Sequence, residues 1–205
     1  MAITAAMVKE LREMTGAGMM DCKKALTETN GDMDAAVDVL KKSGAAKMEK
    51  KQSRIAAEGI ARVAVNGNVA VVAEVNSETD FVAKNETFQE FVQTVADTAL
   101  ASDLNGGANG EDIEALLATN GLSDLLVEKT ATIGEKLSVR RFAKVTGDAV
   151  ASYIHGGGRI GVVIAADGAS DDAAKEALTN IAMQVAAMNP QYISRNDISA
   201  EELAK

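Results

Sequence analysis

The sequence predicts an α+β fold in which a three-helix module precedes a duplicated core of two subdomains with small antiparallel sheets and packed helices. Residues 3–43 show apolar side chains at helical spacing only, and a pattern of two β-rich runs followed by an amphipathic helix occurs twice farther along. Aromatic residues make up only 3% of the 205 residues, so aliphatic side chains and nine methionines have to fill the core. This composition favours helices packed on small sheets.

The N-terminal segment predicts three short helices. Thr4 caps a first helix that ends near Gly16. A second helix covers residues 18–29, and Asp32 caps a third that closes at Ser43-Gly44. The spacing resembles the ubiquitin-associated type of three-helix module. The side chains expected inside this module are Met7, Val8, Leu11, Met14, Met19, Cys22, Leu26, Ala35, Ala36, Val39 and Leu40.

The adjacent pair Met19-Met20 differs from the other apolar residues, because neighbours on a helix cannot both face one side. We expect one of the two on the surface. Residues 41–54 then carry six basic side chains and a single acidic one, Glu49. This stretch is either a solvated connector or an electrostatic contact for an acidic partner. We assign residues 1–54 to the module and this basic linker.

The first half of the core is expected over residues 55–147. Residues 59–75 form two β-rich runs around Asn66-Gly67-Asn68, a strong hairpin signal. Helices are expected near residues 113–117 and 122–132, and a strand over 137–145 would complete the same sheet. The hairpin is followed by a long amphipathic segment with Phe88, Phe91, Val92, Val95 and Leu100 in helical register.

The second half is expected over residues 148–205. Residues 149–166 again form two β runs, here around Gly156-Gly157-Gly158. The triple glycine is either a hairpin turn or a phosphate-binding loop, although the string G-x-x-x-x-G-K-[ST] is absent. The helix that follows ends before Pro190 and is expected to bury one face, made of Ala177, Leu178, Ile181, Val185 and Met188.

Several classes of protein are disfavoured by what the sequence lacks. It contains one cysteine, Cys22, and one histidine, His155, so an internal disulfide, a Cys/His zinc site and nucleophilic catalysis through histidine have no obvious residues. The net charge of −9 argues against binding nucleic acid directly. No run approaches about 18 apolar residues and the N-terminus lacks the pattern of a signal peptide, so we expect a cytoplasmic protein without membrane contact.

The link between the first hairpin and its helix is unusual, because Phe81 stands where a turn normally has polar residues. Phe81 either packs back onto its own sheet or is an exposed residue for recognition by a partner. Asp80, beside it, is the carboxylate with the most unusual setting, and helix capping is its simpler explanation.

Two long strings carry a family resemblance. LREMTGAGMMDCKKAL, residues 11–26, and EVNSETDFVAKN, residues 74–85, closely resemble the two signature stretches of the elongation factor Ts family. The similarity extends through IGEKLSVRRF, residues 133–142, and Tyr153-Ile154-His155-Gly156, to MQVAAMNPQYIS, residues 183–194. It covers essentially the whole chain.

The resemblance implies a guanine-nucleotide exchange factor, not an enzyme, that binds elongation factor Tu, disturbs its magnesium site and promotes GDP release without a cofactor of its own. In longer members a coiled coil and a C-terminal helical module follow the stretch matching ISAEELAK, so the resemblance implies that this chain lacks both. The residues implied to bind the partner are Arg12, Met19 and Met20 in the module, Thr79, Asp80, Phe81 and Val82 near the magnesium site, and His155 on another domain of the partner.

Two other classes of function stay open. A small α+β enzyme with its site at the Gly156 turn would bind a small ligand on its own. A ubiquitin-like adaptor would work through the three-helix module alone, with the core as a spacer.

Overall fold

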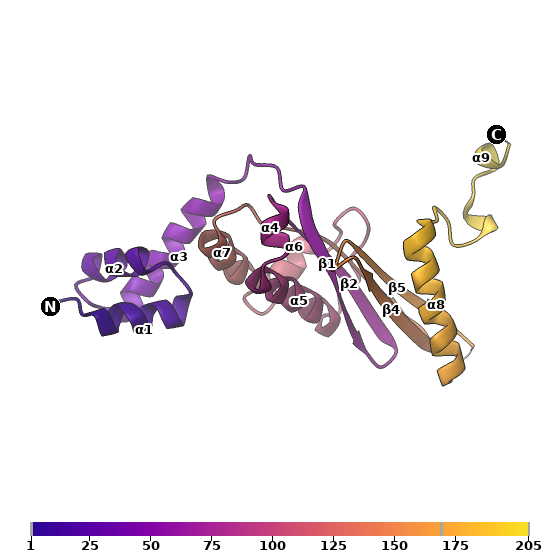
Figure 1. Ribbon diagram of the computed structural model, residues 1–205, viewed down its shortest axis with the longest axis horizontal. Helices are drawn as coiled ribbons and strands as arrows, with labels where there is room; N and C mark the ends of the chain where they lie inside the picture. Colours follow the sequence, from indigo (N-terminus) through magenta and orange to yellow (C-terminus); the bar gives the residue numbers. More distant parts are fainter. Residues whose placement is uncertain (1, 169, 205) are drawn as a thin grey trace.

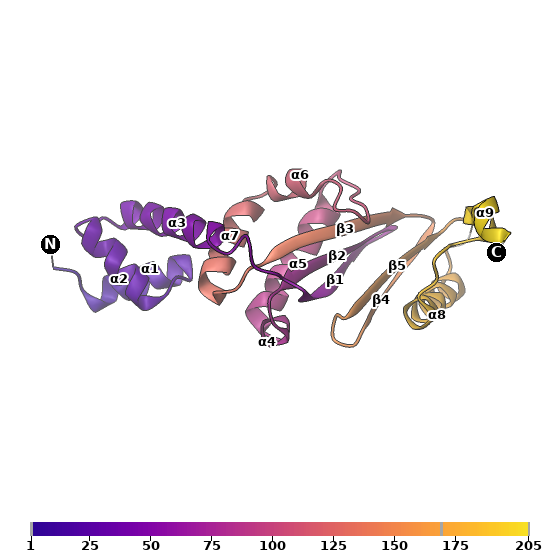
Figure 2. The ribbon, with the colours of Figure 1, turned by 90° about the horizontal axis from the view of Figure 1, so that it is seen from above.

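The computed structural model describes residues 2–168 and 170–204 and has the predicted α+β architecture. The molecule is elongated, with a helical module at one end, a core in the middle, and the last two helices at the other end (Figures 1 and 2). Within the described residues, no helix is both long and apolar enough to cross a membrane.

The module contains the three predicted helices, α1 (Ala5–Thr15), α2 (Met19–Glu28) and α3 (Met33–Glu49). Thr4 and Asp32 cap α1 and α3 as predicted, accepting the backbone N–H of Met7 at 3.2 Å and of Ala35 at 2.9 Å. The expectation that Met14 and Met19 face inward is wrong, because Met14 is 58% exposed and Met19, which starts α2, is 60% exposed. The buried side chains of the module are Val8, Leu11, Cys22, Ala25, Leu26 and Ala36.

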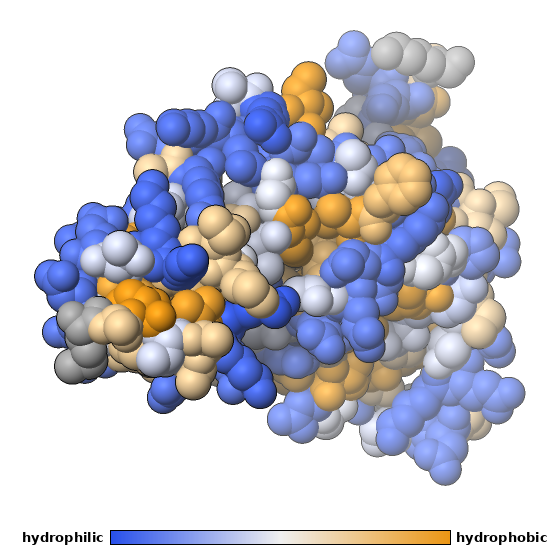
Figure 3. Space-filling view, turned by 60° about the vertical axis from the view of Figure 1, so that its left-hand side comes forward, coloured by the Kyte–Doolittle hydropathy of each residue, from blue (hydrophilic) through white to orange (hydrophobic). Residues whose placement is uncertain are grey.

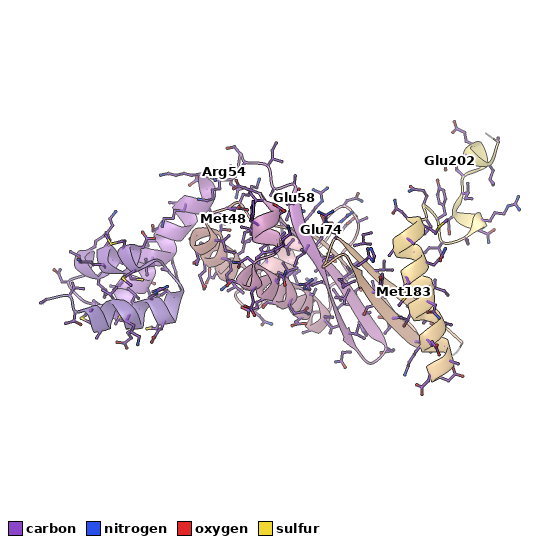
Figure 4. The ribbon with its side chains drawn as sticks, viewed as in Figure 1. Met48, Arg54, Glu58, Glu74, Met183 and Glu202 are labelled. Atoms are coloured by element: carbon purple, nitrogen blue, oxygen red, sulfur yellow. The ribbon has the colours of Figure 1, made fainter. Side chains whose placement is uncertain are left out.

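α3 does not stop at Ser43-Gly44 but continues to Glu49, so the first part of the basic stretch is helical. The reason is a close helix contact. Gly44 is buried against α7 (Leu122–Ile133), and a Cβ atom there would lie 3.1 Å from Cγ1 of Val127. Packing of α3 on α7 thus outweighs the cost of about 1 kcal/mol for a glycine inside a helix. Farther along α3, Met48 packs against the core (Figure 4).

The first half of the core is a three-stranded antiparallel sheet in the order β1-β2-β3, formed by β1 (Glu58–Asn66), β2 (Val69–Ser77) and β3 (Ser138–Thr146). The predicted hairpin and the predicted third strand are both present. The sheet packs against α5 (Glu86–Ala101), and α6 (Ile113–Leu117) and α7 complete this half. The largest side chains buried between these elements are Phe88, Phe91 and Phe142.

The second half repeats the hairpin and helix, with β4 (Ala149–His155), β5 (Ile160–Ala166) and α8 (Asp172–Met188). The hairpin lies between the first sheet and α8 (Figure 2). Its glycine-rich segment is a hairpin turn, as the simpler alternative had it, and the carbonyl of Gly158 accepts the N–H of Ala61 on β1 at 2.7 Å. A short 3-10 helix, η1 (Arg195–Asp197), and α9 (Ala200–Leu203) follow α8.

The predicted buried face of α8 is only partly right. Leu178 and Ala182 are buried, whereas Ile181 is 50% exposed and Met188 is 67% exposed. Ala177 is exposed as well. The sheet that α8 packs on has two strands, and a sheet this narrow covers less of the helix surface than the expected face requires.

The contact at Gly44 leads to a first prediction. Gly44→Leu should separate the module from α7 while both parts stay folded, because the site has no room for a side chain and overpacking costs about 1–3 kcal/mol. Small-angle X-ray scattering should show a larger radius of gyration, with unchanged helical circular dichroism. Ala46→Leu, at an exposed position of the same helix, is the matched control. Identical scattering of Gly44→Leu and the wild type would contradict the prediction.

Candidate functional site

Phe81 lies on α4 (Asp80–Ala83), a single helical turn that directly follows the end of β2. Its side chain is 81% exposed, whereas the other three phenylalanines of the chain are at most 2% exposed. The alternative in which Phe81 packs onto its own sheet is therefore wrong. In a chain with so few aromatic side chains, one of the largest is displayed to solvent.

The neighbours of Phe81 in the predicted Thr-Asp-Phe-Val motif have distinct roles. Thr79 is the N-cap of α4, and its hydroxyl accepts the N–H of Val82 at 3.4 Å. Val82 is half-buried and packs against the main core. Asp80 is not the cap: its carboxylate accepts a hydrogen bond from Nζ of Lys84 at 2.7 Å, and that ammonium group lowers the pKa of Asp80.

Two glutamates that the sequence analysis did not single out support this motif from behind. The carboxylate of Glu135, in the loop between α7 and β3, accepts the backbone N–H groups of Glu78 and Thr79, both at 3.0 Å. The carboxylate of Glu78 in turn accepts the N–H of Lys136 at 2.6 Å, which lowers the pKa of Glu78, with a smaller contribution from Arg54. Their signal in the sequence is weak, because isolated glutamates in loops are common.

The module end of the molecule presents the second group of predicted residues. Arg12 is exposed on α1, and at the start of α2 Met19 and Met20 are 60% and 77% exposed. Met14, at 58%, adds to this set. Figure 3, with the module end turned toward the viewer, shows apolar patches between hydrophilic side chains.

His155 is exposed at the end of β4, beside the glycine turn. Its Nδ1 lies 2.9 Å from the hydroxyl oxygen of Tyr153, and the two rings are 5.9 Å apart between centroids. The structure thus does not gather the predicted residues into one pocket. It spreads them over the surface, from the module through α4 to the second hairpin.

Two cavities are lined by other residues. One, of about 730 Å³, lies between the module and α7 and has mainly apolar walls that include Leu40 and Val127. The other, of about 710 Å³, lies between the first sheet and the second hairpin. A carboxylate in this second cavity, Glu74, is paired with Arg141 at 2.6 Å; Figure 4 shows Glu74 on β2. Among the described residues, no cluster of three or more His, Cys, Asp or Glu side chains is arranged to hold a metal ion.

A comparison with protein-family models shows which family this chain belongs to. The family model described as elongation factor TS matches residues 78–205, which is more than half of the chain. The match begins inside the second signature string and includes the Thr-Asp-Phe-Val motif, the loop with Glu135, and His155. The chain therefore belongs to the elongation factor Ts family, whose members are nucleotide-exchange factors of translation.

Proposed function

We propose that this chain binds elongation factor Tu in its GDP-bound and nucleotide-free forms and accelerates release of GDP by disturbing the magnesium site of that partner. Family membership supports the partner and the exchange role. The observation that carries the mechanism is the display of Phe81, 81% exposed on a helical turn that hydrogen bonds and packing fix to the core. Such a side chain suits insertion into a pocket of a partner.

Exchange of this kind is a problem of linkage. A factor that binds the nucleotide-free partner more tightly weakens nucleotide binding by the same ratio. Each tenfold acceleration requires about 1.36 kcal/mol, so a ~10³-fold effect requires roughly 4 kcal/mol. Burial of one phenylalanine side chain supplies about 1.5–3 kcal/mol. Phe81 therefore accounts for a large share, and the remainder has to come from surrounding contacts.

In this proposal, the free energy of binding is used to disturb the coordination of the magnesium ion in the partner. Mg²⁺ requires near-octahedral coordination at about 2.0–2.1 Å and tolerates little distortion. Insertion of Phe81 between helices of the partner would displace groups that hold the ion. Asp80 would add a carboxylate near the metal, held by Lys84 at 2.7 Å until the partner binds. Without the ion, the charge of the nucleotide phosphates is unshielded and GDP dissociates.

The other predicted residues supply affinity in this proposal. Arg12, Met19 and Met20 would contact the GTPase domain, where flexible methionine side chains adapt to a partner surface. His155 would contact a second domain of the partner. The function requires no cofactor, no covalent step and no direct contact with nucleic acid. We infer a cytoplasmic site of action because translation elongation takes place there.

Phe81→Ala tests the proposal directly. Loss of about 1.5–3 kcal/mol of burial predicts a ten- to hundredfold slower stimulated release of GDP. The thermal unfolding midpoint should change little because the side chain is exposed. A stopped-flow measurement with fluorescent GDP on elongation factor Tu reports the first quantity, and calorimetry reports the second.

Two controls accompany Phe81→Ala. Ile193→Ala removes another exposed apolar side chain and should leave exchange unchanged. Phe88→Ala, in the core, should instead lower stability by about 3–5 kcal/mol. Unchanged GDP release with Phe81→Ala would refute a role for this side chain.

The magnesium mechanism makes a separate prediction. When EDTA removes Mg²⁺ from the partner beforehand, the wild type and Phe81→Ala should stimulate GDP release to the same extent, because the step that Phe81 promotes is already complete. The same stopped-flow assay at fixed Mg²⁺ provides the reference. A difference that persists in EDTA would mean that Phe81 acts on another part of the nucleotide site.

The module contacts should affect binding and not the maximal rate. The double variant Met19→Ala/Met20→Ala should raise the half-saturating concentration of this chain about tenfold, because interface truncations of this size cost 1 kcal/mol or more. The exchange rate at saturation should not change. Met188→Ala, a methionine of similar exposure on α8, is the matched control. If the chain were instead an adaptor that works through the module alone, removal of residues 1–54 would abolish partner binding, whereas Phe81→Ala would leave it unchanged.

A further inference from the structure

The orientation of Phe81 cannot come from α4 alone. α4 has four residues, and helices of that length are unstable in isolation because the first turn fixes many dihedral angles for few hydrogen bonds. Phe81 itself makes little contact with the core. The direction in which it points is therefore set by whatever holds the two ends of α4.

The C-terminal end of α4 is held by packing. Ala83 is buried in the main core, and Val82 packs against the same cluster. The side-chain amide of Gln89, on α5, donates to the carbonyl of Ala83 at 3.3 Å. Polar contacts dominate at the N-terminal end. The hydroxyl of Ser77 donates to the carbonyl of Thr79 at 3.0 Å, and three further hydrogen bonds converge on one side chain, Glu135.

Glu135 accepts three hydrogen bonds from the two residues that precede α4. Besides the two backbone N–H groups, at 3.0 Å each, the hydroxyl of Thr79 donates to Oε1 at 2.6 Å. The single hydroxyl proton of Thr79 thus points to Glu135, which leaves a lone pair free to accept the N–H of Val82. The carboxylate fixes the rotation of the cap as well as the position of the backbone. Hydrogen bonds to a charged acceptor are stronger than neutral ones.

The arrangement is reciprocal, since Glu78 accepts the N–H of Lys136, the residue after Glu135. We call this pair of glutamates, Glu78 and Glu135, the glutamate clasp. The linker is tied to it as well: Arg54 donates to Glu78 at 3.3 Å, and Nζ of Lys136 donates to the carbonyls of Gln52 at 2.6 Å and Arg54 at 3.0 Å. Three segments far apart in the sequence therefore meet behind α4. Figure 4 shows Arg54 at this point, between α3 and β1.

We infer that Glu135 is a positioning residue, which through the glutamate clasp fixes the angle at which Phe81 is presented to the partner. This inference rests on the proposed function, because the angle matters only if Phe81 enters the partner. A side chain held in its bound direction loses less entropy on binding than a mobile one. Glu135→Ala releases the cap of α4 and leaves Phe81 itself intact.

The first test uses the chain alone and does not depend on exchange activity. In Glu135→Ala, the amide protons of Val82, Ala83 and Lys84 should exchange with solvent about tenfold faster by NMR, because opening of α4 becomes easier. The amide of Val71, in the central strand, should keep its protection. Thr79→Ser retains the hydroxyl and should keep the wild-type pattern, whereas Thr79→Val should resemble Glu135→Ala. Glu114→Gln, an exposed glutamate on α6, is the control.

The second test measures GDP release from elongation factor Tu. Glu135→Ala should reduce stimulation about tenfold, which corresponds to 1.36 kcal/mol. In the Phe81→Ala background the same change should cause no further loss, because there is no side chain left to position. Glu135→Gln should fall between the wild type and Glu135→Ala. Its amide has one acceptor oxygen where the carboxylate has two, so it cannot accept both the hydroxyl proton of Thr79 and the two backbone N–H groups.

The outcomes separate the two proposals. Unchanged amide exchange in α4 overturns the role of Glu135, and so does faster amide exchange with unaltered GDP release. Fully additive losses in the double variant mean that Glu135 acts independently of Phe81, which also overturns it. If the wild-type chain does not stimulate GDP release from elongation factor Tu, the proposed function is wrong. The amide measurement still decides whether Glu135 fixes α4.

Discussion

The register of β2 against β3 is the constraint on which the candidate site depends. The two strands are antiparallel, and their last pair is Asn76 with Ser138. If this pairing is continued past the strand ends, Glu78 falls opposite Lys136 and Thr79 falls opposite Glu135. These are the partners that the hydrogen bonds join. The glutamate clasp is thus an extension of the sheet, made with side chains after the backbone ladder has ended.

A β-bulge sets this register. The pairing shifts by one residue between Glu74 and Val75, so that Glu74 faces Arg141 whereas Val75 faces Val139. Without the shift, Thr79 would fall opposite Lys136, and Glu135 would face the residue after Thr79 instead of Thr79 itself. Bulges commonly occur where a strand has to redirect the chain next to a functional site. Here the irregularity lies four residues before the loop that leads into α4.

Elements with strong local patterns could be predicted from the sequence. Both hairpins follow from alternating β-branched residues around glycine turns, and α5 follows from the spacing of Phe88, Phe91 and Val95. The errors lie where a tertiary contact decides. Gly44 ends a helix by local rules, yet it continues α3 because a close approach to α7 requires a residue without a side chain. Met19 satisfies the helical spacing but starts its helix at the surface.

The candidate site divides in the same way. Phe81 is visible in the sequence because an aromatic residue stands where a turn is expected, although the sequence leaves open whether it is buried. Glu135 is not visible by such reasoning. Its role depends on a register that a bulge shifts, 56 residues away from Thr79 along the chain. A pattern within one segment carries no information about such a pairing.

An exposed side chain such as Phe81 binds a partner at a lower entropic cost when the helix that carries it is already rigid. An exposed phenylalanine contributes little to the stability of the free chain, and an aromatic side chain on a mobile loop would have to be ordered at the moment of binding, at a cost in conformational entropy. The fold avoids much of that cost. The packing of Ala83 and the hydrogen bonds to Glu135 order α4 during folding, when the free energy comes from the core formed by α5 and the first sheet. In the proposed function, the hydrophobic free energy of Phe81 is then left for binding the partner, where it would act against bound GDP and Mg²⁺.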